Sequence, residues 1–282
     1  MSVTYRTICE ALCRAGIESA DWDARLLIEH ALGQDATRYL SDPDRELPPS
    51  ETLLDAVGRR ATRYPLQYII GEWDFYRQTY EVSPYCLIPR ADTELLVEEA
   101  IKKLPYGARF ADLCTGSGCI AISVLAERQD TTAIAVDKFE NTLSVARKNA
   151  ERNGVLSRAE LLCADVLIPD FLPVADGTLD AILCNPPYIR TSVLSELAPE
   201  LDAEPRAALD GGEDGLIFYE TLLHSASKYL KKDGCFFFEI GYDQAAALRD
   251  LGTRYGFSGV RVLRDYGGND RVVCLWRENG IH

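Results

Sequence analysis

The sequence predicts an α/β protein in which a mainly parallel sheet is covered by helices and preceded by a small helical domain. From residue 109 onward, short apolar runs alternate with helical patterns, which is typical of a parallel sheet with helices on both faces. The first 65 residues instead show only helical periodicity. Between these parts lie two aromatic and β-branched runs, Trp73–Tyr76 and Thr79–Val82, which predict a β-hairpin linker.

The N-terminal part is expected to hold three amphipathic helices. Apolar residues recur at helical spacing up to Gly16, which ends the first helix. The second is expected to begin at Asp21 and to end at Gly33. Ser50 has the residue type of an N-cap for the third helix, and Pro65 ends it. A module of this size buries little apolar surface alone, so we expect it to depend on the rest of the chain.

The larger part begins with a helix capped by Asp92 or Thr93 and continues with alternating strands and helices. The expected parallel strands are residues 109–114, 132–137, 160–163, 180–184 and 234–240. The expected helices are residues 120–128, 140–153, 216–230 and 243–255. Two final strands, residues 260–264 and 271–276, are joined by a short segment of turn residues, which predicts an antiparallel hairpin.

Composition limits the class of protein. The 282 residues are 47% hydrophobic, enough for one large or two modest cores, and no apolar run is long enough to span a membrane. The N-terminus lacks the charged-then-apolar layout of a signal peptide. The nine cysteines are odd in number, scattered and without a Cys-x-x-Cys pair. These features predict a reduced, cytoplasmic protein.

Charge and histidine content also exclude some functions. The formal net charge of −14 has the wrong sign for a protein that follows a bare phosphate backbone, so no direct nucleic-acid binding is expected. The same charge permits a basic protein partner. Only three histidines are present, His30, His224 and His282, which argues against a His-based metal site or a catalytic triad.

The tetrapeptide Asn185-Pro186-Pro187-Tyr188 follows the expected strand over residues 180–184. Its two prolines end that strand, so the tetrapeptide should lie at a carboxyl strand end, where open α/β sheets bind ligands. The Asn185 side chain and the Pro186 backbone each offer a carbonyl oxygen, and Tyr188 offers a flat aromatic wall. This set suits a planar –NH₂ group, either a Gln or Asn amide or the exocyclic amine of adenine. The alternative is a simple turn.

A second motif, Asp112–Ala121, has the order strand, glycine turn, helix. Gly116 and Gly118 permit a tight turn and a close approach of the backbone to a ligand. Asp137 ends the following strand, at the distance where an acidic residue reaches ribose hydroxyls. The glycine spacing also fits a dinucleotide dehydrogenase, and a plain strand-to-helix turn is the third interpretation.

Two features favour S-adenosylmethionine (SAM) over a dinucleotide. Asp112 precedes the loop, where its carboxylate suits the cationic amino end of a methionine moiety. The partner motif at Asn185 has none of the residues of a hydride-transfer site. If both motifs flank the switch point of the sheet, they open into one crevice. Asp165 and Val166, just past the third strand, are then expected to border the adenine.

Several segments resemble one family of N-methyltransferases, the peptide chain release factor glutamine methyltransferases (PrmC/HemK family). The segments that carry the resemblance are Pro65–Gly71, Ile88–Glu94, Asn185–Tyr188, Glu204–Gly212, Glu239–Gly241 and Asp265–Arg271. The resemblance implies an N-terminal helical substrate-recognition domain (residues 1–65), a hairpin linker (66–90) and a seven-stranded, Rossmann-like, SAM-dependent methyltransferase domain (91–282). It also implies methylation of the side-chain N5 of Gln in the Gly-Gly-Gln motif of release factors, with S-adenosylhomocysteine as the product.

Site residues follow from the same resemblance. The SAM loop is Cys114, Thr115, Gly116, Ser117 and Gly118, with Asp137 on the ribose and Val166 at the adenine edge. The substrate glutamine is held by Asn185, Pro186, Pro187 and Tyr188. The chain departs from the family pattern at three positions: Ala91 in place of Pro, Cys114 in place of Gly, and Val166 where some members have Trp.

An amide nitrogen is a poor nucleophile, so we expect catalysis to come from position and hydrogen bonding. Asn185 Oδ1 and the Pro186 carbonyl would each accept one N–H of the substrate amide, and Tyr188 would pack on the amide plane. Three alternatives are an adenine-N6 methyltransferase acting on a flipped base, a dehydrogenase, and a release-factor binder without activity.

Overall fold

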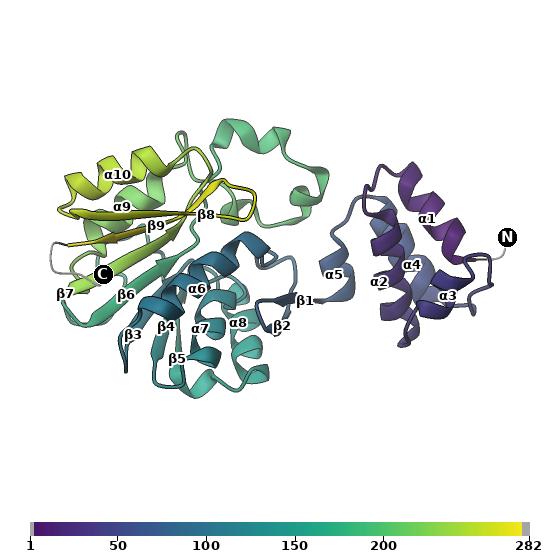
Figure 1. Ribbon diagram of the computed structural model, residues 1–282, viewed down its shortest axis with the longest axis horizontal. Helices are drawn as coiled ribbons and strands as arrows, with labels where there is room; N and C mark the ends of the chain where they lie inside the picture. Colours follow the sequence, from purple (N-terminus) through teal and green to yellow (C-terminus); the bar gives the residue numbers. More distant parts are fainter. Residues whose placement is uncertain (1–2, 278–282) are drawn as a thin grey trace. The chain divides into compact units, whose positions relative to one another are not determined.

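The computed structural model describes residues 3–277, so the end of the last predicted domain, with His282, lies outside the described residues. The chain forms two compact units (Figure 1). The first unit runs to Glu72 and also includes Ala198–Ala203. The second unit comprises Trp73–Leu197 and the described residues from Glu204 onward. The predicted domain boundaries, at residues 65 and 90, differ from this division.

The first unit is built from short helices. They are α1 (Tyr5–Arg14), α2 (Ala20–Leu32), α3 (Thr37–Ser41), α4 (Glu51–Ala61), α5 (Leu66–Ile70) and the 3₁₀ segment η4 (Pro199–Ala203). Ser50 is the predicted N-cap of α4: its hydroxyl accepts a hydrogen bond from the Leu53 backbone N–H at 3.1 Å. Gly33 ends α2 with φ +63°, a conformation that glycine adopts without strain.

Apolar faces of α1, α2 and α4 form the core of this unit, with Leu12, Leu27 and Ile28 fully buried. Helix α5, which the sequence placed in the linker, adds Leu66 and Ile69 to the same core. These side chains are too apolar to remain in water, which explains why the unit extends past residue 65.

An ion-pair cluster is buried beside this core. Arg60 Nε lies 2.6 Å from Asp23 Oδ2, and both side chains are almost completely buried. Glu200 pairs with Arg60 at 3.1 Å and with Arg63 at 2.8 Å, which ties Ala198–Ala203 to the helices.

The predicted hairpin consists of β1 (Glu72–Phe75) and β2 (Gln78–Glu81), which form a separate two-stranded sheet; all of it from Trp73 onward belongs to the second unit. The fully buried Tyr80 anchors it, because the Tyr80 hydroxyl lies 2.7 Å from Ser123 Oγ on the helix that follows the first strand of the large sheet.

The predicted seven-stranded sheet is confirmed, with strand order β5-β4-β3-β6-β7-β9-β8. The strands are β3 (Arg109–Leu113), β4 (Thr132–Asp137), β5 (Ala159–Cys163), β6 (Leu179–Cys184), β7 (Leu230–Glu239), β8 (Gly259–Arg264) and β9 (Asp270–Trp276). Strand β9 runs opposite to the other six strands of this sheet, and it pairs with β8 as the predicted final hairpin. Strand β7 begins earlier than expected, at Leu230, and shortens the preceding helix.

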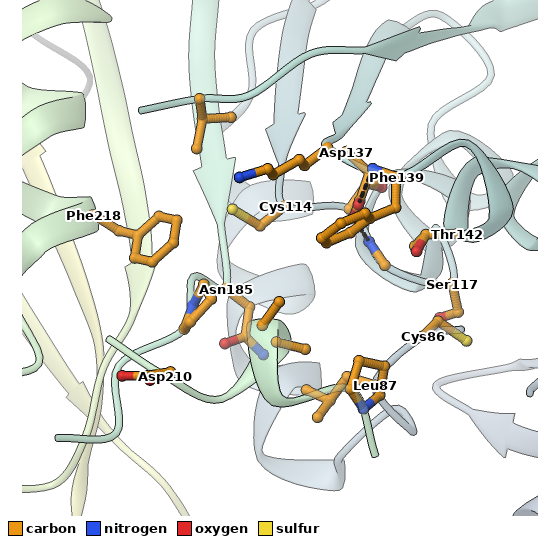
Figure 2. A pocket seen from close by; sticks show the side chains of 18 of the residues that line it. Cys86, Leu87, Cys114, Ser117, Asp137, Phe139, Thr142, Asn185, Asp210 and Phe218 are labelled. Atoms are coloured by element: carbon orange, nitrogen blue, oxygen red, sulfur yellow. Dashed lines mark hydrogen bonds between the residues drawn. The ribbon is translucent and has the colours of Figure 1, made fainter. Parts of the chain in front are cut away.

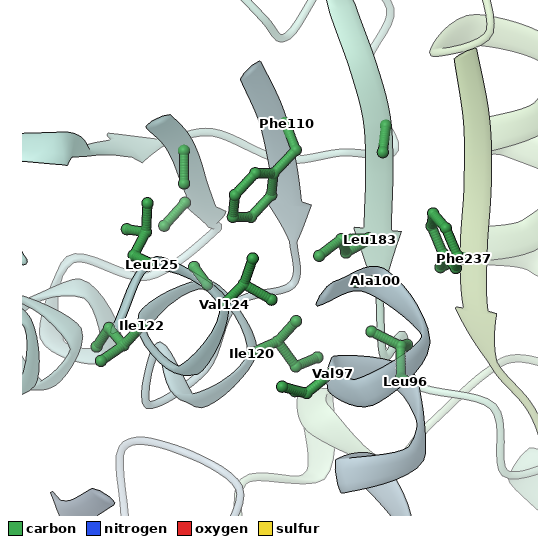
Figure 3. Packing of buried hydrophobic residues seen from close by; sticks show 14 of the residues in the cluster. Leu96, Val97, Ala100, Phe110, Ile120, Ile122, Val124, Leu125, Leu183 and Phe237 are labelled. Atoms are coloured by element: carbon green, nitrogen blue, oxygen red, sulfur yellow. The ribbon is translucent and has the colours of Figure 1, made fainter. Parts of the chain in front are cut away.

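Helices cover both faces of the sheet (Figure 1). Helices α6 (Glu94–Lys103), α7 (Cys119–Glu127) and α8 (Glu140–Arg152) pack on one face, and α9 (Ile217–Ser225) and α10 (Ala245–Arg254) on the other. Figure 3 shows part of the face covered by α6, α7 and α8. Val97 of α6 and Ile120 of α7 lie between these two helices, and Leu183 points toward them from β6. The remaining 3₁₀ turns of the unit are η1 (Ala91–Thr93), η2 (Leu156–Arg158), η3 (Thr191–Glu196) and η5 (Arg206–Ala208).

The connections place a switch point between β3 and β6. The chain runs outward from β3 through β4 to β5 and then returns to β6, which pairs with β3 in the register Leu113–Cys184. The loops that leave these two strands therefore diverge and open a crevice at their carboxyl ends.

Candidate active site

A cavity of about 430 Å³ occupies this end of the sheet (Figure 2). Its walls come from the loop after β3, the ends of β4 and β5, the loop after β6 and residues 85–90 of the chain that leads into α6. Part of residues 205–218 completes the lining. The structure thus brings the two predicted motifs, the glycine loop and Asn185, into one cavity.

The glycine loop turns sharply at three positions with positive φ: Cys114 (+59°), Gly116 (+57°) and Gly118 (+82°). Gly118 is also required for packing, because an added Cβ would fall 2.8 Å from Ile122 Cδ1. The loop residues Cys114, Thr115, Gly116 and Ser117 line the cavity, while Gly118 lies behind them as the N-cap of α7.

Asp112 lies beneath this loop and does not line the cavity. Its Oδ2 accepts hydrogen bonds from Thr115 Oγ1 at 2.6 Å and from the Ala121 N–H at 3.1 Å. Its Oδ1 is buried without a hydrogen-bond partner among the described residues. Burial raises the pKa of this carboxyl to about 7, despite the two hydrogen bonds. Asp112 therefore braces the loop from below, in addition to any attraction for a cation above it.

Asp137 lies on the cavity wall at the end of β4. Its two carboxylate oxygens accept hydrogen bonds from the backbone N–H groups of Gly116, at 3.0 Å, and of Phe139, at 3.1 Å. Burial raises its pKa, while these hydrogen bonds lower it. Each oxygen keeps a lone pair for a ligand hydroxyl. Asp165 and Val166 also line the cavity, and Asp165 is paired with Lys138 at 2.9 Å.

The four residues of the Asn185 motif have different places. Asn185 and Pro187 line the cavity, and Figure 2 shows the Asn185 side chain between Cys114 and Asp210. Pro186 is buried outside the lining. The Tyr188 ring also lies outside it and packs against the sheet core, while the Tyr188 hydroxyl donates to Glu239 Oε1 at 3.3 Å.

Two residues beside Asn185 were not singled out as site residues from the sequence. Thr93 lines the cavity, and its Oγ1 accepts a hydrogen bond from Asn185 Nδ2 at 3.2 Å. Glu239 ends β7, and its carboxyl is fully enclosed. Both belong to segments that carry the family resemblance, Ile88–Glu94 and Glu239–Gly241. The sequence therefore marked these segments, but it assigned neither residue a role in the site.

The lining fits SAM. The acidic group at Asp137 and the open loop at Gly116 suit a ribose and the chain attached to it, and the apolar Val166 suits a flat base edge. Two buried polar atoms under the loop, Asp112 Oδ1 and Ser117 Oγ, have no hydrogen-bond partner among the described residues. Of these two residues, only Ser117 belongs to the cavity lining, so its hydroxyl is the polar atom that a ligand or a water molecule in the cavity would complete.

Comparison with known proteins agrees with this geometry. Residues 91–240 match the family model described as "Methyltransferase small domain", and residues 5–71 match "PrmC N-terminal domain". A methyltransferase from Pyrococcus furiosus has a similar fold, with a TM-score of 0.54 at 19% identity over 72% of this chain and 89% of that one. The fold and the matched domain define a SAM-dependent methyltransferase.

Curated relatives identify the family more closely. The chain is 38% identical to the release factor glutamine methyltransferase of Geobacter sulfurreducens, over 93% of this chain and 91% of the relative. It is 40% identical to that of Caulobacter vibrioides, over 92% and 90%. The chain belongs to the release factor glutamine methyltransferase family. Within residues 3–277, no helix is both long and apolar enough to cross a bilayer.

Proposed function

We propose that the cavity binds SAM and the side chain of the glutamine in the Gly-Gly-Gln motif of peptide chain release factors, and that Asn185 directs methyl transfer to N5 of that glutamine. The observation that carries the proposal is the shared cavity of the glycine loop and Asn185 at the switch point of the sheet. The family relationship supplies the substrate class.

SAM, when bound, supplies a methyl group on a positively charged sulfur. Cys114 to Ser117 and Asp137 are the residues that would hold it, and Asp165 and Val166 would border its adenine. Gly118 and Asp112 support the loop from behind and below. We assign none of these residues the role of a base: Asp112 lies outside the cavity lining, Asp165 is paired with Lys138, and Asp137 is assigned to the ribose.

Asn185 orients the substrate amide. An amide nitrogen shares its lone pair with the carbonyl, so it becomes nucleophilic only when its N–H bonds are held by acceptors that favour charge on the nitrogen. We assign one acceptor to Asn185 Oδ1, which belongs to a residue of the lining, and keep the Pro186 carbonyl as the second acceptor expected from the sequence, although Pro186 itself lies outside the lining. The N–H protons become acidic as the nitrogen gains positive charge, so one is lost to solvent without a dedicated base.

We assign Tyr188 the role of holding the Asn185 motif in place, and not that of a direct contact with the substrate amide. Its ring packs on the sheet core and its hydroxyl is held by Glu239, which fixes the end of the tetrapeptide. Its backbone carbonyl accepts a hydrogen bond from Gln244 Nε2 at 3.1 Å. We retain Tyr188 as a substrate-site residue because it follows Pro187 and excludes water from the back of the motif.

The partner follows from charge and family. A net charge of −14 favours a basic protein surface over a nucleic acid, so we propose that the release factor is bound without direct contact to RNA or DNA. All nine cysteines are free thiols, which suits the cytoplasm, where release factors act.

The test is methyl transfer from labelled SAM to a purified release factor, beside the same factor with Gly-Gly-Ala in place of Gly-Gly-Gln. Label in the first and none in the second is the expected result. Label in an adenine-containing oligonucleotide, with none in the release factor, would instead indicate the adenine-N6 alternative.

Asn185→Ala tests the assigned residue. We expect transfer to be lost while the affinity for SAM, measured by calorimetry, stays within a few-fold of the wild type. An equal loss of SAM binding would make Asn185 a cofactor residue and would leave the acceptor role without support.

A further inference from the structure

The glycine loop after β3 is not rigid by composition. Gly116 and Gly118 adopt positive φ, at +57° and +82°, and glycine exchanges such conformations with others at little cost. A flexible loop has to be ordered when a ligand binds, and this ordering weakens the affinity. The affinity of the loop for SAM therefore depends on how firmly the rest of the protein holds it beforehand.

Two groups that hold the first half of the loop are the carboxylates of Asp112 and Asp137, which accept hydrogen bonds from it. The second half is the peptide unit between Ser117 and Gly118. The Gly118 N–H donates to the Thr115 carbonyl at 2.9 Å and closes the turn. The other polar atom of this peptide unit is the Ser117 carbonyl oxygen.

Asn149 holds that oxygen. Its Nδ2 donates to the Ser117 carbonyl at 2.9 Å from helix α8. Asn149 is fully buried and lies outside the cavity lining, whereas Ser117 belongs to the lining. The carbonyl of Ser117 is therefore bonded to the protein interior. Because both polar atoms of the Ser117–Gly118 peptide unit are bonded, the unit cannot rotate without breaking two hydrogen bonds.

The hairpin orients the Asn149 amide in turn. Glu81, the last residue of β2, bonds to it twice: the Glu81 N–H donates to Asn149 Oδ1 at 2.6 Å, and the Glu81 carbonyl accepts from Asn149 Nδ2 at 3.0 Å. A backbone N–H only donates and a carbonyl only accepts, so these contacts permit one orientation of the amide. An amide nitrogen carries two hydrogens, so Nδ2 serves both Glu81 and Ser117.

A second contact ties the hairpin to the same region. Tyr80 precedes Glu81 in β2, and its hydroxyl lies 2.7 Å from Ser123 Oγ and 3.3 Å from the Cys119 carbonyl oxygen. Ser123 and Cys119 both belong to α7, the helix that follows the glycine loop. Strand β2 thus contacts α7 directly and reaches the loop in front of it through Asn149.

We propose that Asn149 is a positioning residue for SAM, through which the hairpin holds the glycine loop in its binding conformation before the cofactor arrives. This rests on the proposed role of the glycine loop in holding SAM. Asn149 raises the affinity without touching the cofactor, because it fixes the peptide unit between Ser117 and Gly118. The hairpin, which the sequence predicted only as a linker, is then also a support of the cofactor site.

Calorimetry with SAM tests the proposal in the full-length protein. Asn149→Ala removes all three side-chain hydrogen bonds, and we expect Kd for SAM to rise about 10-fold, the equivalent of one buried hydrogen bond. At saturating SAM, kcat and KM for a Gly-Gly-Gln release factor should stay within about two-fold of the wild type, since the Asn185 motif is held by contacts of its own. An unchanged Kd, or a fall in kcat as large as the change in Kd, would overturn the proposal.

Asn153→Ala is the matched control. Asn153 follows α8 directly, and its Nδ2 donates to the carbonyls of Thr79, in the same hairpin, at 3.4 Å and of Asn149 at 2.9 Å. Neither carbonyl belongs to the glycine loop, so Kd for SAM should be unchanged. An equal rise of Kd in both variants would show that any loosening of the hairpin has this effect, and the assignment of Asn149 would fail.

Hydrogen exchange in the wild type gives a test that does not depend on a variant that folds. Without SAM, the amides of Gly118 and Glu81 should both exchange slowly, because both are bonded in the structure. Fast exchange at Gly118 that slows only when SAM is added would mean that the ligand orders the loop, contrary to the proposal. If the wild type binds no SAM in the calorimeter, the proposed function fails instead, which is a separate result.

Discussion

Gly211 lies against the backbone of Tyr188: a Cβ added to Gly211 would fall 2.7 Å from Tyr188 Cα and 2.8 Å from the Pro187 carbonyl oxygen. The Gly211 N–H also donates to the Ile189 carbonyl at 2.8 Å, and the Ile189 N–H donates to the Leu209 carbonyl at 3.0 Å. The segment that contains Gly211 is thus paired directly with the end of the Asn185 motif. No side chain fits between them.

Gly211→Ala should therefore displace the Asn185 motif. We expect a loss of about 1–3 kcal/mol in stability from overpacking and a fall in kcat, because the substrate acceptors move with the backbone. Gly58→Ala is the matched control, since an added Cβ there has open space within α4 and should stabilise the protein by about 0.5–1 kcal/mol. An unchanged kcat in Gly211→Ala would show that small backbone shifts accommodate the added Cβ without displacing the substrate acceptors.

Asp112 should make stability depend on pH. Burial raises its folded pKa to about 7, above the value of an unfolded aspartate, so the folded state holds the proton more tightly. Its contribution to stability is then fully present below about pH 4 and is lost as the pH rises toward 7. Asp112→Asn should flatten the decline of the melting temperature between about pH 4 and pH 7. An identical slope in variant and wild type would contradict the raised pKa.

Cys114 adopts φ +59°, a conformation that costs a residue with a Cβ about 1 kcal/mol or more. We expect Cys114→Gly to be more stable than Cys114→Ala by about that amount, because both lack the thiol and only Ala keeps the strained Cβ. Chemical denaturation of the two variants measures the difference directly. Equal stabilities would mean that the loop relaxes around residue 114.

The buried Arg60–Asp23 ion pair should contribute far more to the stability of the protein than an exposed ion pair between the same residue types. Asp23→Ala leaves the buried Arg60 with Glu200 as its one remaining carboxylate partner among residues 3–277, and we expect a loss of about 3 kcal/mol in stability. Asp44→Ala removes the exposed partner of Arg6, at 2.7 Å, and should have no measurable effect. Thermal unfolding of both variants gives the comparison, and equal shifts would refute a special role for burial.

Much of this protein could be predicted from local patterns. Alternating apolar strands and helical runs predicted the seven strands of the large sheet. The spacing of apolar residues, every two residues in a strand and every 3.6 in a helix, is visible within a short stretch of sequence. The glycine turn at Gly116 and the strand end at Asn185 could also be predicted from the sequence. Glycine permits backbone conformations that other residues avoid, and proline fixes φ and cannot donate a backbone hydrogen bond. The rule that ligands bind at a switch point then predicted that these two motifs share a cavity.

Tertiary structure decided the rest, because burial and hydrogen-bond partners depend on residues far apart in the chain. Asp112 was expected to face the ligand, and the fold places it beneath the loop, where Ala121 and Thr115 occupy one of its oxygens. Thr93 meets Asn185 across 92 positions of sequence, and Glu239 at the end of β7 meets Tyr188 across 51, because folding brings these segments together. The sequence determined which functional side chains the site can use. Three-dimensional packing determined which of these side chains are in contact and which carboxyl groups are buried.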